Sequence, residues 1–128
     1  MPEELDFHDG FVDGVLISGS TARIFLRSVA GETFTLVLAE VEGPLVNDLR
    51  KGNIIFNVTL LSVDELDADF VFRIYQYSDE HKRKFVLEDW TEAAKKKGLG
   101  ALEITPSYGC TISALFRGHT MISGHVSA

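Results

Sequence analysis

Short runs of alternating apolar and polar residues, separated by glycine-containing turns, limit most strongly how this chain can fold. The runs 22–28 and 33–41 each place aliphatic side chains at every second position, which is the period of a β-strand with one buried face. Glycines in the turns Ser18–Ser20 and Ala30–Glu32 supply the positive φ that tight hairpins need. The first third of the chain therefore predicts three consecutive antiparallel strands.

Further strand-like runs follow along the chain, at 53–63, 70–77, 81–88, 101–107 and 110–118. The run 53–63 is the most apolar of them, so we place it at the centre of the sheet. Gly43-Pro44 interrupts the pattern before it, and we expect a loop or a short helical turn over 45–53.

One segment, at about 88–97, has helical periodicity. Trp90, Ala93, Ala94 and Lys97 share one face of such a helix, and we expect Trp90 to anchor it on the sheet. Acidic residues precede lysines along the segment, and Gly98 follows it, as the helix dipole and a C-terminal stop favour.

The order of the elements predicts the fold class. Parallel sheets need a crossover helix between most strands, so many strands with one late helix favour an α+β, mainly antiparallel β domain. We expect a strongly bent sheet or barrel-like meander of about six to eight strands. Residues 1–128 are the size of a single domain, and weak patterning predicts a frayed tail at 118–128.

Charge and cysteine content exclude several classes of function. The formal net charge of −7 disfavours nucleic acid and anionic membrane surfaces as partners. A single cysteine, Cys110, excludes an internal disulfide and multi-cysteine metal sites, and we expect it to be a small buried side chain. The acidic start and the absence of a long apolar run predict a cytoplasmic protein with no membrane span.

The stretch 6–14, DFHDGFVDG, holds the most conspicuous candidate site. His8, Asp9 and Asp13 are candidate ligands for a metal or a small molecule. In an extended strand, however, His8 and Asp9 point to opposite faces and do not reach one ion without a bend. The interpretation we favour makes this stretch an edge strand, with its apolar residues in the core and its glycines at a bulge.

The other motifs fit known metal-binding or phosphate-binding sites less well. The aspartates at 64–69 lack the glycine and glutamate positions of a calcium loop, and Gly98-Leu99-Gly100 follows a helix where a phosphate-binding loop would precede one. His119 and His125 would meet at one ion only in an ordered tail. We therefore predict no catalytic residues, metal or cofactor.

The outward face of the sheet is the strongest positive indication. It carries more apolar residues than a solvated face needs, namely Phe25, Val37, Ile55, Leu61, Val71 and Tyr75. Either the helix or a second subunit would cover it. We predict a homodimer that pairs Phe25, Val37 and Ile55, with Arg23 and Arg27 at the rim.

The segments FHDGFVDGV at 7–15 and DLRKGNIIFNV at 48–58, with the hairpin between them, resemble small bacterial domains of unknown function, some grouped with toxin-immunity proteins. The resemblance implies an intracellular bacterial binding protein whose acidity faces a basic partner. We accordingly predict a non-enzymatic, acidic interaction module. The alternative is a small-ligand or metal-binding domain, or a minor hydrolase, that uses His8, Asp9 and Asp13.

Overall fold

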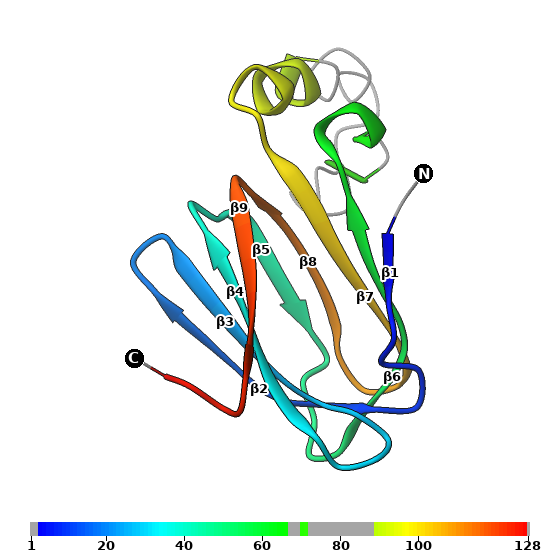
Figure 1. The fold of residues 1–128 in the computed structure, drawn as a ribbon. Coiled ribbons are helices and arrows are strands. Elements are labelled where there is room, and N and C mark those ends of the chain that lie inside the picture. The colour runs from blue at the N-terminus through cyan, green and yellow to red at the C-terminus, as the bar shows by residue number, and fades with distance from the viewer. Residues whose placement is uncertain (1–2, 67–69, 72–88, 128) are drawn as a thin grey trace.

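The computed structural model describes residues 3–66, 70–71 and 89–127. These residues form nine strands, a short 3-10 turn, a helix over 89–96 and two further helical residues at 70–71 (Figure 1). The strands are β1 (Glu3–Leu5), β2 (Phe11–Ser18), β3 (Thr21–Arg27), β4 (Thr33–Ala39), β5 (Glu42–Asn47), β6 (Asn53–Leu61), β7 (Gly100–Tyr108), β8 (Thr111–Phe116) and β9 (Gly118–Ser123), and the turn is η1 (Val63–Glu65).

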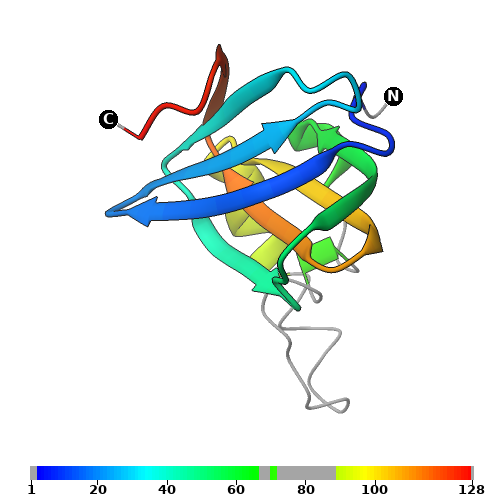
Figure 2. The same cartoon turned by 90° about the horizontal axis from the view of Figure 1, so that it is seen from below.

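All nine strands belong to one antiparallel sheet. Their order is β5-β8-β7-β6-β2-β3-β4-β9, and β1 adds to β6 beside this path. The sheet bends until β2, β3 and β4 lie across from β6, β7 and β8 (Figure 2), and within the described residues it does not close into a barrel. The predicted α+β class with a bent antiparallel sheet and a central run 53–63 is confirmed.

The hairpins form where glycine permits a left-handed backbone. Gly19 and Gly31 have φ values of 59° and 90° and connect β2 to β3 and β3 to β4. The register of β2 against β3 shifts between Val12 and Gly14, which confirms a bulge in the opening strand. Gly10 has a different role, because a Cβ there would overlap the carbonyl oxygen of Arg27.

The main core lies between the facing halves of the bent sheet. Alternate aliphatic residues of β3 and β4 meet those of β6, β7 and β8, as their period-two patterns predict. The completely covered members include Leu26, Leu36, Leu38, Leu102 and Ile104.

Ile55 belongs to this core and not to the outward face, so that part of the predicted interaction face is wrong. Its side chain is 1% exposed, whereas that of its neighbour Phe56 is 50% exposed. The register of β6 against β7 is irregular on both sides of Ile55, and an extra residue in a strand reverses which side chains point inward. The bulge therefore turns Ile55 into the same core as Val58 and Leu60.

Two segments are more regular than expected. Residues 42–47 form β5, paired with β8, where we expected the chain to leave the strand pattern. Residues 118–123 form β9, paired with β4 from Ala39 to Phe34, where we expected a frayed tail. Both strands are stabilised by partners distant in sequence, which local patterning does not reveal.

Gly98 lies just beyond the helix over 89–96 and terminates it, as predicted. Gly98 has φ 74°, its amide donates to the Lys95 carbonyl, and the Leu99 amide donates to the Ala94 carbonyl. This pair of hydrogen bonds is the Schellman arrangement, in which the residues at its two ends also pack together. Leu99 and Ala94 do so in a second, smaller core with Leu66, Phe70, Val71, Ala101 and Leu115.

The prediction that Trp90 anchors the helix is wrong. Trp90 is 36% exposed, whereas Thr91 and Ala94 are 8% and 5% exposed. The buried face of the helix is thus rotated about the helix axis by one residue, or about 100°, from the predicted face that contains Trp90.

The predicted strands at 70–77 and 81–88 lie almost entirely outside the described residues. The two residues of 70–77 that are described, Phe70 and Val71, are helical and buried. Val71 is 0% exposed, so it does not belong to an outward sheet face.

Candidate functional site

The stretch that holds His8 and Asp9 is a tight turn between β1 and β2. Asp9 adopts φ 62°, its amide donates to the Ile55 carbonyl at 3.0 Å, and the Gly10 amide donates to the Phe7 carbonyl at 2.8 Å. The Ile55 amide donates in return to the Gly10 carbonyl. The turn is thus bound to the bulge of β6 by backbone hydrogen bonds.

The side chain of His8 packs on the same bulge. Its Nδ1 lies 2.9 Å from the carbonyl oxygen of Phe56, so the tautomer protonated at Nδ1 donates a hydrogen bond there, and its ring meets the Phe56 ring edge-on. Its Nε2 lies 3.7 Å from a carboxylate oxygen of Asp9, and both side chains are largely exposed. In the described part of the chain, no three His, Cys, Asp or Glu residues are grouped as a metal site requires.

Asp13 has other partners than His8 and Asp9. Arg27 donates two hydrogen bonds to its carboxylate, at 3.2 and 3.1 Å, and the guanidinium carbon of Arg27 lies 4.3 Å from the centre of the Phe11 ring. The hydrogen bond and the charge of Asp13 raise the pKa of Arg27. His125 Nε2 is 3.5 Å from the Asp13 carboxylate. A site that combines His8, Asp9 and Asp13 stays a prediction.

His125 belongs to the C-terminal tail, residues 124–127, which lies on the outer face of β3 and β4. Thr35 holds this tail, because its hydroxyl donates to the Gly124 carbonyl at 2.7 Å and accepts from the Val126 amide at 2.8 Å. Arg23 donates to the Val126 carbonyl, and the His125 and Phe25 rings are 5.4 Å apart. Thr35 is 0% exposed although it points away from the core.

The tail accounts for part of the predicted interaction face. Phe25, Val37, Arg23 and Arg27 do lie together on β3 and β4 and are half-buried. The described cover over Phe25 is the tail of the same chain, whereas we expected the helix or a second subunit. Tyr75, the remaining member of the predicted face, lies outside the described residues.

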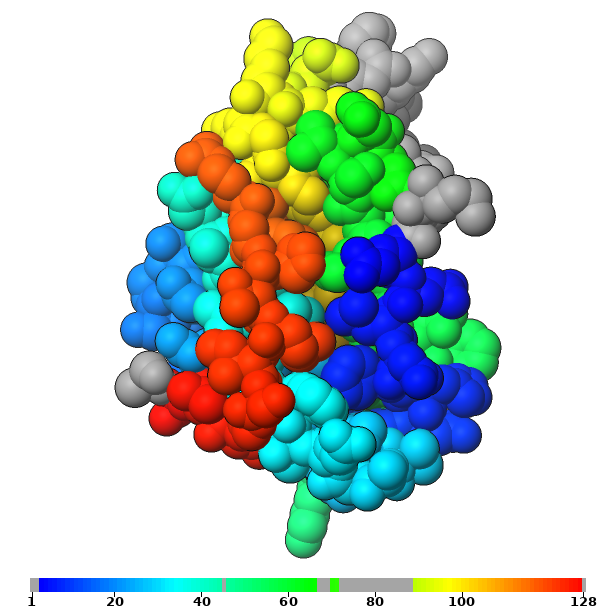
Figure 3. Space-filling model, in the orientation of Figure 1, coloured from blue at the N-terminus to red at the C-terminus, as the bar shows by residue number. Residues whose placement is uncertain are grey.

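A second surface was missed by the sequence patterns. β9 (orange) and β1 (blue) face each other across a narrow gap, which we call the seam (Figure 3). Two hollows lie along the seam. The upper hollow, of about 340 Å³, is lined by Glu3 of β1 and His119 of β9, and the lower hollow, of about 440 Å³, by Leu5 and Met121 of the same strands. The alternation of His119 and Met121 is the signal in the sequence, but the weak patterning of 118–128 predicts a tail there and not a strand.

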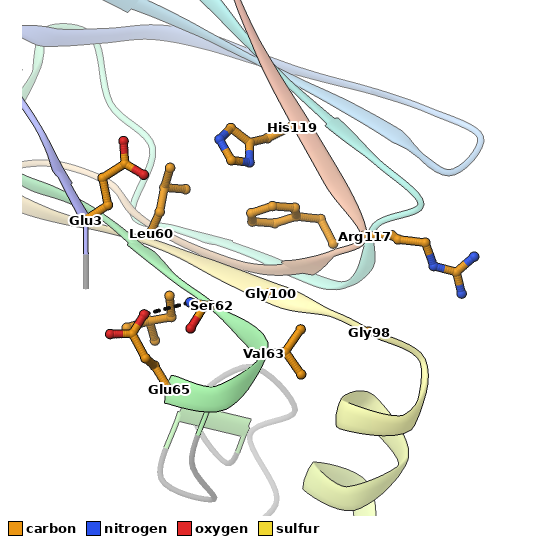
Figure 4. Close-up of a pocket in the computed structure, with 11 residues that line it drawn as sticks. Glu3, Leu60, Ser62, Val63, Glu65, Gly98, Gly100, Arg117 and His119 are labelled. Carbon is orange, nitrogen blue, oxygen red and sulfur yellow. Dashed lines mark hydrogen bonds between the residues drawn. The ribbon is translucent and has the colours of Figure 1, made fainter. Parts of the chain in front are cut away.

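The walls of the upper hollow differ in chemistry. Glu3 stands on the β1 side and His119 on the β9 side, while Arg117 points away from the hollow (Figure 4). Arg117 pairs with Glu40 at 3.0 Å. Glu65 accepts a hydrogen bond from the Ser62 amide at 2.9 Å, which lowers the pKa of its carboxyl group. Apolar side chains, including Leu60 and Phe116, form the floor.

Cys110 is buried, as predicted. Burial raises the pKa of its thiol, which disfavours the reactive thiolate. Its amide donates to the side-chain oxygen of Asn53, a buried residue that also binds the Val12 and Arg50 carbonyls. At this end of the sheet, the hydrogen bonds of Asn53 therefore hold the strands and turns together.

None of the helices in the described ranges has the length and apolar character to cross a bilayer. Comparison of the chain with protein-family models, with curated proteins and with solved structures finds no match. The resemblance to small bacterial domains therefore stays a prediction, and function has to be argued from the two surfaces.

Proposed function

We propose that this chain is a non-enzymatic interaction module that binds a basic protein partner. The observation that carries the proposal is an imbalance of charge at the N-terminal segment. Glu3, Glu4 and Asp6, which we call the N-terminal carboxylates, are exposed and have no Lys or Arg within salt-bridge distance among the described residues.

Four carboxylates elsewhere on the described surface are neutralised locally. Asp13 pairs with Arg27, Asp48 with Arg50, Glu42 with Lys97 and Glu40 with Arg117, at 3.0 to 3.1 Å. The net charge of −7 is thus distributed unevenly over the described surface. A concentrated negative field speeds encounter with a positively charged partner and repels nucleic acid.

The alternative, a hydrolase or metal-binding domain, has less support. It requires His8, Asp9 and Asp13 to converge, and their contacts go to separate neighbours: the turn packs on Phe56 and Ile55, and Asp13 binds Arg27. A binding function needs no such convergence.

The test is capture from a lysate of the cells that make the protein, at low and at physiological salt, with identification of the retained proteins. We expect a basic protein whose retention falls about tenfold when the N-terminal carboxylates are replaced together, as Glu3→Gln, Glu4→Gln and Asp6→Asn. A matched variant, Asp64→Asn with Asp89→Asn and Glu92→Gln, removes the same charge elsewhere and should retain the partner.

Two results would contradict the proposal. One is recovery of the chain alone at every salt concentration. The other is equal loss of binding in both triple variants, which would mean that net charge matters and the N-terminal segment does not. Circular dichroism of each variant verifies that it is folded.

A further inference from the structure

The seam lies between two free strand edges. In the described residues, β1 pairs with β6 and β9 pairs with β4, and neither strand has a second neighbour in the sheet. Their facing edges therefore present backbone amide and carbonyl groups without strand partners.

β1 and β9 run in the same direction along the seam. Glu3 and His119 line the upper hollow, and Leu5 and Met121, two residues further along each strand, line the lower one. Both strands thus run from the upper hollow toward the lower one, as Figure 1 shows.

This parallel relation is what one missing strand produces. In an antiparallel sheet, two strands that share a neighbour run parallel to each other, because each is antiparallel to the strand between them. Every pairing described in this sheet is antiparallel. One additional strand, antiparallel to both β1 and β9, would continue the same pattern.

The edge of β9 lacks the devices that usually block such additions. β5, at the other end of the strand order, contains Pro44 and an irregular register after Glu42. The β9 sequence, GHTMIS, has no proline, lysine or acidic residue, and its register with β4 is continuous over six residues. Proline, charge and bulges are the features by which edge strands avoid new partners.

The chemistry of the seam limits what fits there. Its floor is apolar, with Phe116 and Leu60 under the upper hollow and Phe7 and Phe34 under the lower. Its margins are mainly acidic: Glu3 stands at the upper end, and Asp6 and Glu32 at the lower. The cation Arg117 is already paired with Glu40.

We propose that the seam receives an extended, basic segment of the partner protein, which adds to the sheet antiparallel to β1 and β9. The inference rests on the proposed function and deepens it by naming the surface and the conformation of the partner. Alternate side chains of the segment are apolar and face the floor. Lysine or arginine lies toward its N-terminal part, beside Asp6 and Glu32.

The test uses a displayed library of random nine-residue peptides, selected on the intact chain. We expect enrichment of peptides with apolar residues at alternate positions, an excess of lysine and arginine, and depletion of proline. Enrichment of acidic peptides, or no enrichment above that on the blocked variant described next, would overturn the proposal.

A matched pair of variants locates the binding. Met121→Lys puts a cation into the lower hollow, where Met121 is 36% exposed, and should weaken the selected peptides at least about tenfold. Thr120→Lys adds the same charge to the other face of β9, where Thr120 is exposed, and should change affinity less than about twofold. Equal effects of the two substitutions would place the binding outside the seam.

Amide hydrogen exchange distinguishes binding in the seam from binding of a basic partner elsewhere on the chain. Bound peptide should protect amides of β9 and leave those of β5, the other sheet edge, unchanged. If a basic partner is captured from lysate but Met121→Lys does not weaken it and β9 is not protected, the interaction module stands and the seam is wrong. If no basic protein is captured, the proposed function fails whatever the peptides do.

Discussion

The outer face of β3 and β4 and the seam between β1 and β9 both expose apolar side chains outside the main core, yet the chain covers them differently. On the outer face, residues 124–127 contact Phe25 and leave Thr35 0% exposed. In the seam, Met121 and Val29 remain 36% and 74% exposed beside hollows that no described segment fills.

The difference follows from the polar groups that each surface offers. Thr35 presents one hydroxyl beside Phe25, and that hydroxyl both donates to and accepts from the tail. The seam offers strand edges, which are satisfied along their length by another strand and not by a single side chain. A short tail suits the first surface, and an extended segment suits the second.

The largest expected effect distinguishes the floor of the seam from its wall. Phe116→Ala removes a ring that is 4% exposed in the main core and should lower the free energy of unfolding by about 3–5 kcal/mol. Met121→Ala, on the uncovered wall, should cost less than about 1 kcal/mol. Urea unfolding measures both. Equal costs would mean that the wall is packed as tightly as the floor.

Removal of residues 124–128 should have the next largest effect. The deletion exposes Phe25 and leaves Thr35 without its two tail partners, at a cost of about 1–3 kcal/mol. Self-association through Phe25 and Val37 stays a prediction, and we expect it to be stronger in the truncated chain than in the full one. Sedimentation at micromolar concentration tests this, with Phe25→Asp as the control that restores a monomer.

Thr35→Val keeps the shape of the side chain and removes the hydroxyl that holds the tail. We expect a loss of about 1–2 kcal/mol, since two hydrogen bonds at a buried position are broken. Thr120→Val, at an exposed position of β9, is the matched control and should change the melting temperature little. An unchanged melting temperature in Thr35→Val would show that the tail does not depend on this residue.

The smallest effect is expected for His125→Ala. The backbone hydrogen bonds to Thr35 remain, and the His125 side chain lies at the surface, so stability should change by about 0.5 kcal/mol or less. The amide of Val126 should nevertheless exchange faster, because the hydrogen bond of the His125 ring to the Leu26 carbonyl, its contact with the Phe25 ring and its approach to Asp13 are lost. Unchanged exchange would mean that Thr35 and Arg23 hold the tail without His125.

For the candidate site, sequence patterns predicted which face of the sheet most residues lie on better than they predicted what those residues contact. The period-two runs correctly placed Phe25 and Val37 on one face with Arg23 and Arg27. They failed at Ile55, because a bulge in β6 reverses the alternation and a bulge cannot be read from hydrophobicity alone. The helix pattern failed at Trp90 in a similar way, since the buried stripe follows Thr91 and Ala94 and not the aromatic side chain.

The amino-acid sequence by itself determined the fold class, the glycine turns, the helix end at Gly98 and the burial of Cys110, because each depends on local backbone preference or on side-chain polarity. Only the tertiary structure decided that β9 is a strand, that Thr35 holds the tail, and that β1 and β9 lie parallel across a seam. These features come from contacts between residues far apart in sequence, such as Thr35 with Gly124, Val37 with Thr120 and Glu3 with Leu60. Period-two patterning marks a face as apolar, but what covers it depends on where distant segments pack.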